Sequence, residues 1–428
     1  MLAHTLPIAS LMSGVALLLI GNGLLGTLVA VRGNQEGFSD AFLGLLGSGY
    51  FAGYLVGTLL ARPFIERVGH IRAFAFFATG IAGVALLHGL IVSPVVWVAL
   101  RVLAGAAIVA LYMLIESWLN DQTPAALRGR IFAIYMVVNQ VSLAAAQQIL
   151  RLDSADTLAL FAMSALFVCF AVMPVTATRM TQPSVHRGAS FSVLRIMRGT
   201  PVAAAGAIMT GMSLGAFSSM GPVYASRAGY GDTWIALFMS ASILGGALLQ
   251  WPLGVLSDRG DRRKVLAVTA SLAALSAAPL LVPGLGQDAA IVAIALFGGF
   301  GFAIYPMAVA HLVDHLSPEQ VVGGSSAVLL LHGIGAAIGP LAVGLSMAWM
   351  GTSALAFHFV ATHTLLALIA WLAARRSPDE ITEHAHCVPM VRTSATVLEI
   401  MPPPDPIDES AEDSAAAAAR RPVTSETV

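Results

Sequence analysis

The sequence predicts an all-α membrane protein with twelve transmembrane helices, and three observations support that fold class. Apolar residues fill 57% of the 428 positions and charged residues only 11%, whereas soluble domains carry about 25% charged residues. The mean hydropathy is +0.82. Apolar runs near the ~20 residues that cross a bilayer recur along the whole chain. Because lipid cannot satisfy open backbone groups, each run is expected to be a helix. A soluble globular enzyme is excluded.

Twelve runs are long enough to span a bilayer. The first lacks the positive flank and the small-residue cleavage site of a signal peptide, so we expect it to be retained as a span. The runs cover 8–31, 41–61, 72–92, 95–118, 129–150, 157–178, 201–225, 233–256, 265–283, 288–313, 322–348 and 352–374.

The basic residues between these runs predict an orientation. With the N-terminus in the cytoplasm, the cytoplasmic loops and the start of the tail hold fifteen Lys and Arg residues, against three (Arg32, Arg151 and Arg227) on the other side. Basic residues concentrate in cytoplasmic loops. We therefore expect a multi-pass protein of a bacterial-type inner membrane, surrounded by lipid, with both termini in the cytoplasm.

The longest internal loop divides the chain into two pseudo-symmetric six-helix halves. We expect an N-terminal half over 1–178, a cytoplasmic linker over 179–200 and a C-terminal half over 201–374. Beyond residue 374 the sequence turns polar, with Pro402–Pro404 and a run of alanines. Such a segment cannot bury enough apolar surface to offset the entropy of ordering. We expect 375–428 to be a disordered cytoplasmic tail.

Several function classes do not fit this composition. The net charge of −1 provides no basic field for nucleic acid. Two isolated cysteines, Cys169 and Cys387, form neither a disulfide framework nor a four-ligand metal site. No nucleophile, acid–base pair or metal set clusters at one depth, as a membrane enzyme would require. A non-transporting sensor would need a folded signalling domain, for which the tail is too polar. We expect no enzyme activity, no cofactor and no metal.

A charged motif follows the second and the eighth runs, 192 residues apart. The later copy reads Gly254-Val-Leu-Ser-Asp258-Arg259-Gly260-Asp261-Arg262-Arg263-Lys264, and the earlier copy Arg62-Pro-Phe-Ile-Glu66-Arg67-Val68-Gly69-His70-Ile71-Arg72. Here the chain resembles the major facilitator superfamily, whose loop motif is Gly-x-x-x-Asp-Arg-x-Gly-Arg-Arg. In the earlier copy Arg62 replaces the glycine and Glu66 the aspartate.

Further segments resemble the YcaD-like branch of that superfamily. Arg101-Val-Leu-Ala-Gly105 is similar to the superfamily's Arg-x-x-x-Gly motif, and Glu116-Ser117-Trp118 and Gln250-Trp251-Pro252-Leu253-Gly254 are similar to the branch. Over residues 8 to 374 the resemblance implies the superfamily's fold and transport by alternating access. The antiporter motif Gly-x-x-x-Gly-Pro-x-x-Gly is missing from the fifth run and occurs in the eleventh, from Gly335 to Gly344. This departure favours uptake over drug efflux.

The repeated motif is interpreted as a gate. It sets an acid at a helix end near arginines and a neighbouring helix N-terminus, so its ion pairs can form in one conformation and break in another. The residues expected to form the gate are Glu66, Arg67, Gly69 and Arg72 in the first half, and Gly254, Asp258, Arg259, Arg262 and Arg263 in the second.

Arg101 is the clearest candidate inside the membrane, where ionisable residues are costly and usually functional. At 100° per residue, Arg101, Gly105, Tyr112 and Glu116 fall within about 60° on one helix face. Arg101 could hold a substrate carboxylate or favour the ionised form of a proton-carrying acid, and Glu116 is the candidate proton site. Alternatively, both side chains extend to the membrane interfaces or pair with neighbouring helices.

Other polar residues in the runs are expected to complete a cavity. Asn22, Tyr112, Asn139, Gln140 and Tyr305 are candidate substrate contacts, although amides in membrane helices often only join helices together. His332 is a candidate for both substrate and proton contacts, or a packing residue. Tyr50 and Tyr54 are interpreted as packing or interface aromatics.

These residues predict a function. A cavity with amides and aromatics but few charges suits a small, planar, largely uncharged solute, such as a vitamin (riboflavin, for example) or another heteroaromatic compound. We expect a monomeric secondary transporter that takes up this solute together with protons by alternating access. Efflux of drugs or amphipathic metabolites is the alternative.

Overall fold

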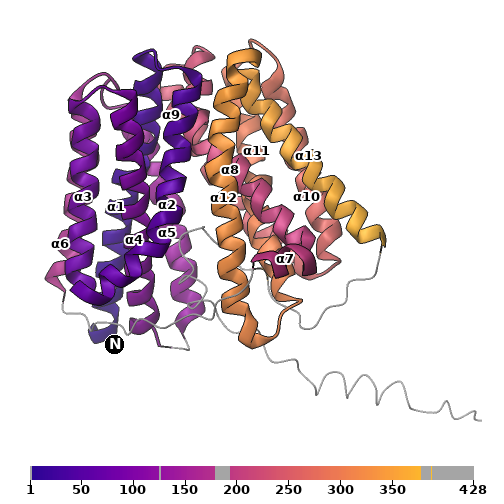
Figure 1. The fold of residues 1–428 in the computed structure, drawn as a ribbon, viewed down its shortest axis with the longest axis horizontal. Helices are drawn as coiled ribbons and strands as arrows, with labels where there is room; N and C mark the ends of the chain where they lie inside the picture. The colour runs from indigo at the N-terminus through magenta and orange to yellow at the C-terminus, as the bar shows by residue number, and fades with distance from the viewer. Residues whose placement is uncertain (1, 125–126, 179–192, 377–386, 388–428) are drawn as a thin grey trace, which may run out of the picture.

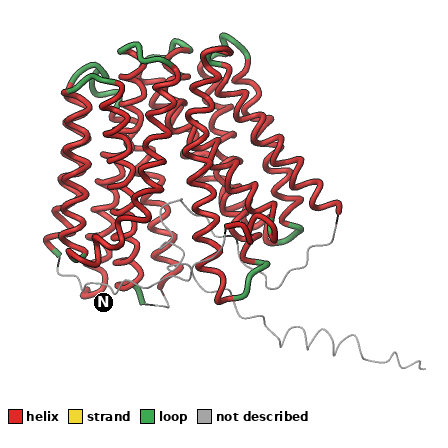
Figure 2. Tube along the Cα trace, in the orientation of Figure 1, coloured by secondary structure: helices red, strands yellow, loops and turns green. Residues whose placement is uncertain are grey.

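Long helices make up the part of the chain that the structure describes. The computed structural model describes residues 2–124, 127–178, 193–376 and 387, and within these ranges it contains no strand. The first half comprises α1 (Leu2–Gln35), α2 (Asp40–Val68), α3 (His70–Leu90), α4 (Pro94–Gln122), α5 (Arg128–Ile149) and α6 (Leu158–Ala177). The second half comprises a short α7 (Val193–Gly199), α8 (Pro201–Arg227), α9 (Asp232–Asp258), α10 (Arg262–Ala277), a 3₁₀ turn (Ala278–Leu281), α11 (Gln287–Val313), α12 (Pro318–Met350) and α13 (Ser353–Arg376) (Figures 1 and 2).

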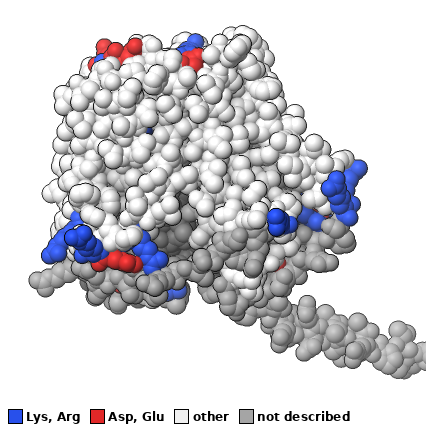
Figure 3. All heavy atoms as spheres, in the orientation of Figure 1, with Lys and Arg blue, Asp and Glu red and all other residues white. Residues whose placement is uncertain are grey.

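Twelve of the described helices are long and apolar enough to cross a membrane, which confirms the predicted fold class. In the space-filling view of Figure 3, charged side chains gather at the two ends of the bundle and the belt between them is almost free of charge. This arrangement fits lipid around the middle and water at the ends. We call the end at which the N-terminus lies the N-terminal end, and the other the far end.

The helices run farther than the apolar segments of the sequence. The second run was expected to end at residue 61 and the eighth at 256, but α2 continues to Val68 and α9 to Asp258. Glu66 and Asp258 therefore lie on helix ends rather than in loops. Hydropathy marks the lipid-buried part of a helix, whereas its backbone hydrogen bonds continue into the polar interface. The expected linker over 179–200 contains the short helix α7. The expected disordered tail over 375–428 lies outside the described residues, except for Arg375, Arg376 and Cys387.

Glycines bring the same helix pair into backbone contact in each half. A Cβ on Gly105 of α4 would lie 1.9 Å from the carbonyl oxygen of Tyr50 in α2. In the second half, a Cβ on Gly298 of α11 would lie 2.1 Å from the carbonyl oxygen of Ser242 in α9. Only glycine permits so close an approach between membrane helices. The contact fixes the register of Tyr50 against the helix turn that carries Arg101.

Polar contacts join the two halves toward the far end. Arg227 of α8 forms an ion pair with Asp40 of α2, with 2.5 Å between Nη1 and Oδ1, and donates from Nε to Asn34 Oδ1 at 2.8 Å. Gln148 of α5 donates from Nε2 to Ser240 Oγ of α9 at 2.7 Å. We call these residues the far-end clamp.

The glycine contact gives the first prediction. Gly105→Ala places a methyl group against the backbone of α2, so we expect it to destabilise the fold by about 1–3 kcal/mol, as overpacking does, and to lower the unfolding temperature of the purified protein. Gly80→Ala in α3 is the matched control, because a Cβ there meets no atom within 4 Å. Equal unfolding temperatures for the two variants would contradict the proposed packing role.

Candidate functional site

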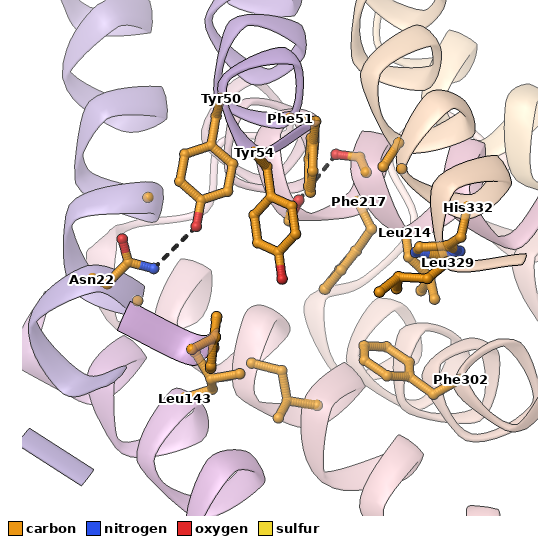
Figure 4. A pocket seen from close by; sticks show the side chains of 18 of the residues that line it. Asn22, Tyr50, Phe51, Tyr54, Leu143, Leu214, Phe217, Phe302, Leu329 and His332 are labelled. Carbon is orange, nitrogen blue, oxygen red and sulfur yellow. Dashed lines mark hydrogen bonds between the residues drawn. The ribbon is translucent and has the colours of Figure 1, made fainter. Parts of the chain in front are cut away.

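A cavity of about 310 Å³ lies between the two halves, and Figure 4 shows part of its lining. Its lining comes from α1, α2, α4 and α5 of the first half and from α8, α9, α11 and α12 of the second. The volume falls at the small end of the range for small-molecule sites, about 300–1,000 Å³. Both halves therefore contribute to one candidate binding site.

The two walls of this cavity differ in chemistry. The second-half wall is mainly apolar, and Figure 4 shows Phe302 and Leu329 across the cavity from Tyr50 and Tyr54. The first half contributes the polar residues Asn22, Thr27, Tyr50, Tyr54, Thr58, Arg101, Tyr112, Gln140 and Gln147. The second half contributes Leu214, Phe217, Met239, Ile243, Phe302, Leu329 and Leu330, with Ser218, Ser326 and His332.

Arg101 lies in the polar wall and is 7% exposed. It precedes Gly105 by one helix turn, so the backbone contact of α4 with α2 sets its position. Its Cζ atom lies 4.3 Å from the centroid of the Tyr50 ring, a cation–π contact. Tyr50 Oη in turn accepts a hydrogen bond of 3.2 Å from Asn22 Nδ2. Helices α1, α2 and α4 thus meet in one cluster of Asn22, Tyr50 and Arg101.

Four buried polar atoms in this wall have no hydrogen-bond partner among the described residues. They are Arg101 Nη1, Tyr54 Oη, Gln140 Nε2 and Asn22 Oδ1. Buried polar groups are normally paired, because an unpaired group keeps its desolvation penalty. Polar atoms left in this state on one wall of a cavity are suited to binding a polar ligand.

Most of the predicted substrate contacts line the cavity. Asn22, Arg101, Tyr112, Gln140 and His332 do so. Asn139 and Tyr305 are not among the lining residues.

Those two side chains make other contacts. Asn139 donates from Nδ2 to the carbonyl oxygen of Tyr135 one turn earlier, at 2.8 Å, and the ring of Tyr305 packs against His332 at 4.8 Å between centroids. Tyr305 thus packs against a lining residue, whereas Asn139 bonds the backbone of its own helix.

Sequence reasoning missed Tyr50 and Tyr54, which were interpreted as packing aromatics. Both line the cavity from α2. The sequence feature that could have indicated this is Gly53, which lies between the two tyrosines in the sequence and contacts α4. A Cβ on Gly53 would lie 2.0 Å from the carbonyl oxygen of Val102. A glycine that marks the α4-facing side of α2 also places its neighbouring aromatics near Arg101.

Glu116 and His332, the candidate proton sites, occupy different surroundings. Glu116 is fully buried and accepts a hydrogen bond of 2.9 Å from Tyr135 Oη. It lies one helix turn beyond Tyr112, which lines the cavity. Nδ1 of His332 lies 3.1 Å from the carbonyl oxygen of Ala207, a contact that requires the proton on Nδ1. Glu116 therefore lies just behind the cavity and His332 at its surface.

The second copy of the charged motif forms an ion-pair network at the N-terminal end. Arg262 lies between two acids: its Nη1 is 2.6 Å from Asp258 Oδ1 and its Nε 2.5 Å from Asp314 Oδ2, at the end of α11. Asp314 is fully buried, and sequence reasoning did not single it out. The network joins the ends of α9, α10 and α11.

Asp261 caps the start of α10. Its Oδ1 accepts from the backbone N–H of Arg263 at 3.0 Å. Although partial burial opposes ionisation, the hydrogen bonds and charge of Arg263 hold the pKa of the Asp261 carboxyl below its usual value.

The first copy of the motif is built differently. Glu66 pairs with Arg62 on its own helix, with 3.0 Å between Oε1 and Nε, and both side chains are partly exposed. His70 occupies the position in the first copy that Arg262 occupies in the second, 192 residues later. Its Nε2 lies 3.4 Å from Ser117 Oγ of α4. Gly69 has a φ of 84° and makes the sharp joint between α2 and α3. The exposed Arg67 and Arg72 flank this joint.

The second copy also contacts a residue of the C-terminal tail. The backbone N–H of Cys387 donates to Asp258 Oδ1 at 2.9 Å, and a Cβ on Gly254 would lie 3.4 Å from Cys387 Sγ. Burial, together with the nearby charge of Asp258, raises the pKa of the Cys387 thiol to about 12. Cys387 is therefore a neutral, packed thiol at this position.

The model of the Major Facilitator Superfamily matches residues 11–328 and 235–394 of the chain. The chain belongs to the major facilitator superfamily. It is accordingly a multi-pass membrane transporter and not an enzyme. It is 30% identical over 346 residues, 79% of this chain and 88% of the relative, to the uncharacterised MFS-type transporter YcaD of Escherichia coli O139:H28.

Solved structures of major facilitators share the fold of this chain. A point mutant of the nucleoside transporter NupG matches with a TM-score of 0.73 at 13% identity, covering 86% of this chain and 99% of that one. A bacterial homologue of the human lysosomal transporter Spinster, in an inward-facing and occupied conformation, matches with a TM-score of 0.70 at 17% identity, covering 88% and 98%. A D-xylose–proton symporter matches with a TM-score of 0.65 at 14% identity, covering 87% and 98%.

The difference between the two motif copies gives the second prediction. Asp258→Asn removes one of the two carboxylates that hold Arg262, so we expect it to slow solute counterflow in proteoliposomes several-fold while solute binding is kept. Glu66→Gln is the matched control, because its partner Arg62 lies on the same helix and both are exposed to solvent, where an ion pair contributes little. Equal turnover in both variants would refute the role of the Arg262 network.

Proposed function

We propose that this major facilitator is a secondary active transporter that carries a small, flat, vitamin-like or heteroaromatic solute through the central cavity by alternating access. The observation that carries the proposal is the position of the cavity: it lies between the two halves, and each half supplies one of its walls. A site at the interface of two repeats can be exposed first to one side and then to the other when the repeats rock.

Access to the cavity is proposed from the N-terminal end. Thr58 and Ser326 extend the lining toward that end, whereas the far-end clamp holds the halves together at the other. Rocking would break the clamp between Arg227 and Asp40 and close the N-terminal end. Because basic residues concentrate at the N-terminal end, we assign it to the cytoplasm of an inner-membrane protein, which functions as a monomer of two six-helix halves.

The lining supports the class of solute. Tyr50, Tyr54 and Phe302 offer ring faces against which a flat ring system can stack. A nucleoside transporter and a D-xylose–proton symporter share this fold, so the fold by itself does not select the solute. Because the aromatic lining, and not the fold, indicates the class of solute, riboflavin and related heteroaromatic vitamins are the first compounds to test.

Proton coupling is proposed through Glu116, with Arg101 and His332 as assisting groups. A buried carboxylate that accepts from Tyr135 and lies one turn from a cavity residue can load and release a proton as the halves move. The absence of the fifth-helix antiporter motif favours uptake. Efflux of amphipathic compounds remains the second candidate, because the second-half wall is mainly apolar.

Blocking the cavity tests transport through it. A Cβ on Gly26, a lining residue, would meet no atom within 4 Å, so Gly26→Phe can fill the cavity without disturbing the helices. We expect counterflow of any solute found by thermal-shift screening to fall at least tenfold, with an unchanged unfolding temperature. Gly80→Phe, on the exposed face of α3, is the control. Normal counterflow in Gly26→Phe would refute passage through this cavity.

Proton coupling has its own test. Glu116→Gln keeps the volume of the side chain and the hydrogen bond from Tyr135 but cannot ionise. We expect the variant to lose accumulation driven by a pH gradient, because no proton is loaded, and to keep energy-independent counterflow. Accumulation at the wild-type level would rule out Glu116 as the proton carrier.

A further inference from the structure

We propose that the solute is an amphipathic monoanion whose carboxylate binds Arg101 while its apolar body packs against the second-half wall. The inference rests on the transport function proposed above and narrows its solute class. The sequence predicted a largely uncharged solute, although it also offered Arg101 as a residue that could hold a substrate carboxylate. The geometry of the polar wall favours a solute with one negative charge.

The charge of Arg101 is not balanced within the described structure. Among the described residues, no carboxylate lies within 4.0 Å of its guanidinium. The ring of Tyr50 faces one side of the guanidinium, and a cation–π contact offsets only part of the cost of burying a charge. Since Arg101 is 7% exposed within the membrane-spanning helix α4, an anion in the cavity would supply the missing compensation.

Three of the four unpartnered polar atoms in the first-half wall are donors. Arg101 Nη1, Tyr54 Oη and Gln140 Nε2 each carry a hydrogen that no described residue accepts. A carboxylate only accepts, through two oxygens with about four lone-pair directions, so it can take up several donors at once. A guanidinium binds a planar carboxylate through two parallel hydrogen bonds. A wall with an unpaired guanidinium and further unpartnered donors therefore fits a carboxylate better than an amide, which would bring its own donors.

The number of charges is limited to one. Arg101 is the single Lys, Arg, Asp or Glu among the described lining residues. A dianion would bring a second negative charge without a partner, and a cation would be repelled.

The opposite wall requires an apolar body. Phe217, Phe302 and Leu329 form part of the second-half lining, and burying a ring or chain against them removes apolar surface from water. An anion without such a body gains only the Arg101 contact. The site therefore distinguishes an aromatic carboxylate from both its neutral amide and a small carboxylate.

Matched pairs of ligands test this inference directly. Purified protein in phosphatidylcholine nanodiscs is titrated with 2-naphthoate against 2-naphthamide, nicotinate against nicotinamide, and acetate, with the shift in unfolding temperature as the readout. We expect an aromatic carboxylate to bind at least tenfold more tightly than its amide, and acetate to give no shift at the same concentration. If amides bind as tightly as carboxylates, if no carboxylate binds, or if acetate is as effective as naphthoate, the inference is overturned.

Variants assign the preference to Arg101. Arg101→Gln should abolish the carboxylate preference but keep amide binding, and Arg101→Lys should keep a weaker preference. Arg376→Gln, at the exposed end of α13, is the control that should behave as wild type. A carboxylate preference that survives in Arg101→Gln overturns the inference. The wild-type titration remains decisive even if a variant fails to fold.

Counterflow separates this inference from the proposed function. Carboxylate-selective binding without counterflow of the bound compound would contradict transport and leave the anion site standing. Counterflow of an uncharged solute at the wild-type rate in Arg101→Gln would support transport and overturn the anion site.

Discussion

The inability of lipid to solvate charge is the constraint on which the rest of this structure depends. On the face drawn in Figure 3 the charged side chains gather at the two ends of the bundle, and the same constraint makes a cation buried within a membrane-spanning helix costly. Arg101 is retained at 7% exposure in spite of that cost. It contacts Tyr50, and the same wall of the cavity holds further unpartnered donors, which is why we propose that this wall binds an acceptor. Arg101 is therefore the residue on which our proposal for solute binding rests.

The internal repeat explains how one cavity has two unlike walls. In both halves a glycine brings two helices into backbone contact, Gly105 on α4 and Gly298 on α11. Four residues before these glycines lie Arg101 in the first half and the buried Ile294 in the second. The two halves thus share the glycine-mediated helix contact, whereas the side chain one turn before the glycine is charged in the first half and apolar in the second. One half therefore supplies most of the polar lining of the cavity, and the other supplies a mainly apolar lining.

The sequence predicted some features well and others poorly, for physical reasons. Twelve helices follow from apolar runs, and Arg101 stands out because a charge within such a run is rare. Tyr50 and Tyr54 were interpreted as packing or interface aromatics, and they pack against the core and also line the cavity. The lining was not predicted because, in a helix that is apolar all round, periodicity does not tell the lipid-facing side from the cavity-facing side. Asn139 was placed with the cavity residues, although its side chain bonds the backbone of its own helix. The partnership of Arg262 with Asp314 depends on how α10 meets α11, which no local pattern encodes.

Alternating access between the two halves is the central claim, and spin-label distances across both ends of the bundle test it most directly. One pair, on Gln35 and Ala228, reports on the far end, and a second, on Arg130 and Gly260, reports on the N-terminal end; all four positions are exposed. The distances are measured in nanodiscs for wild type and for Arg227→Ala, a variant that lacks the ion pair with Asp40 in the far-end clamp. The account predicts a larger far-end-open population in Arg227→Ala, accompanied by an equal fall in the N-terminal-end-open population. Two results would contradict the account: the far end opens in the variant without closure of the N-terminal end, or each label pair shows one distance that is the same in wild type and variant.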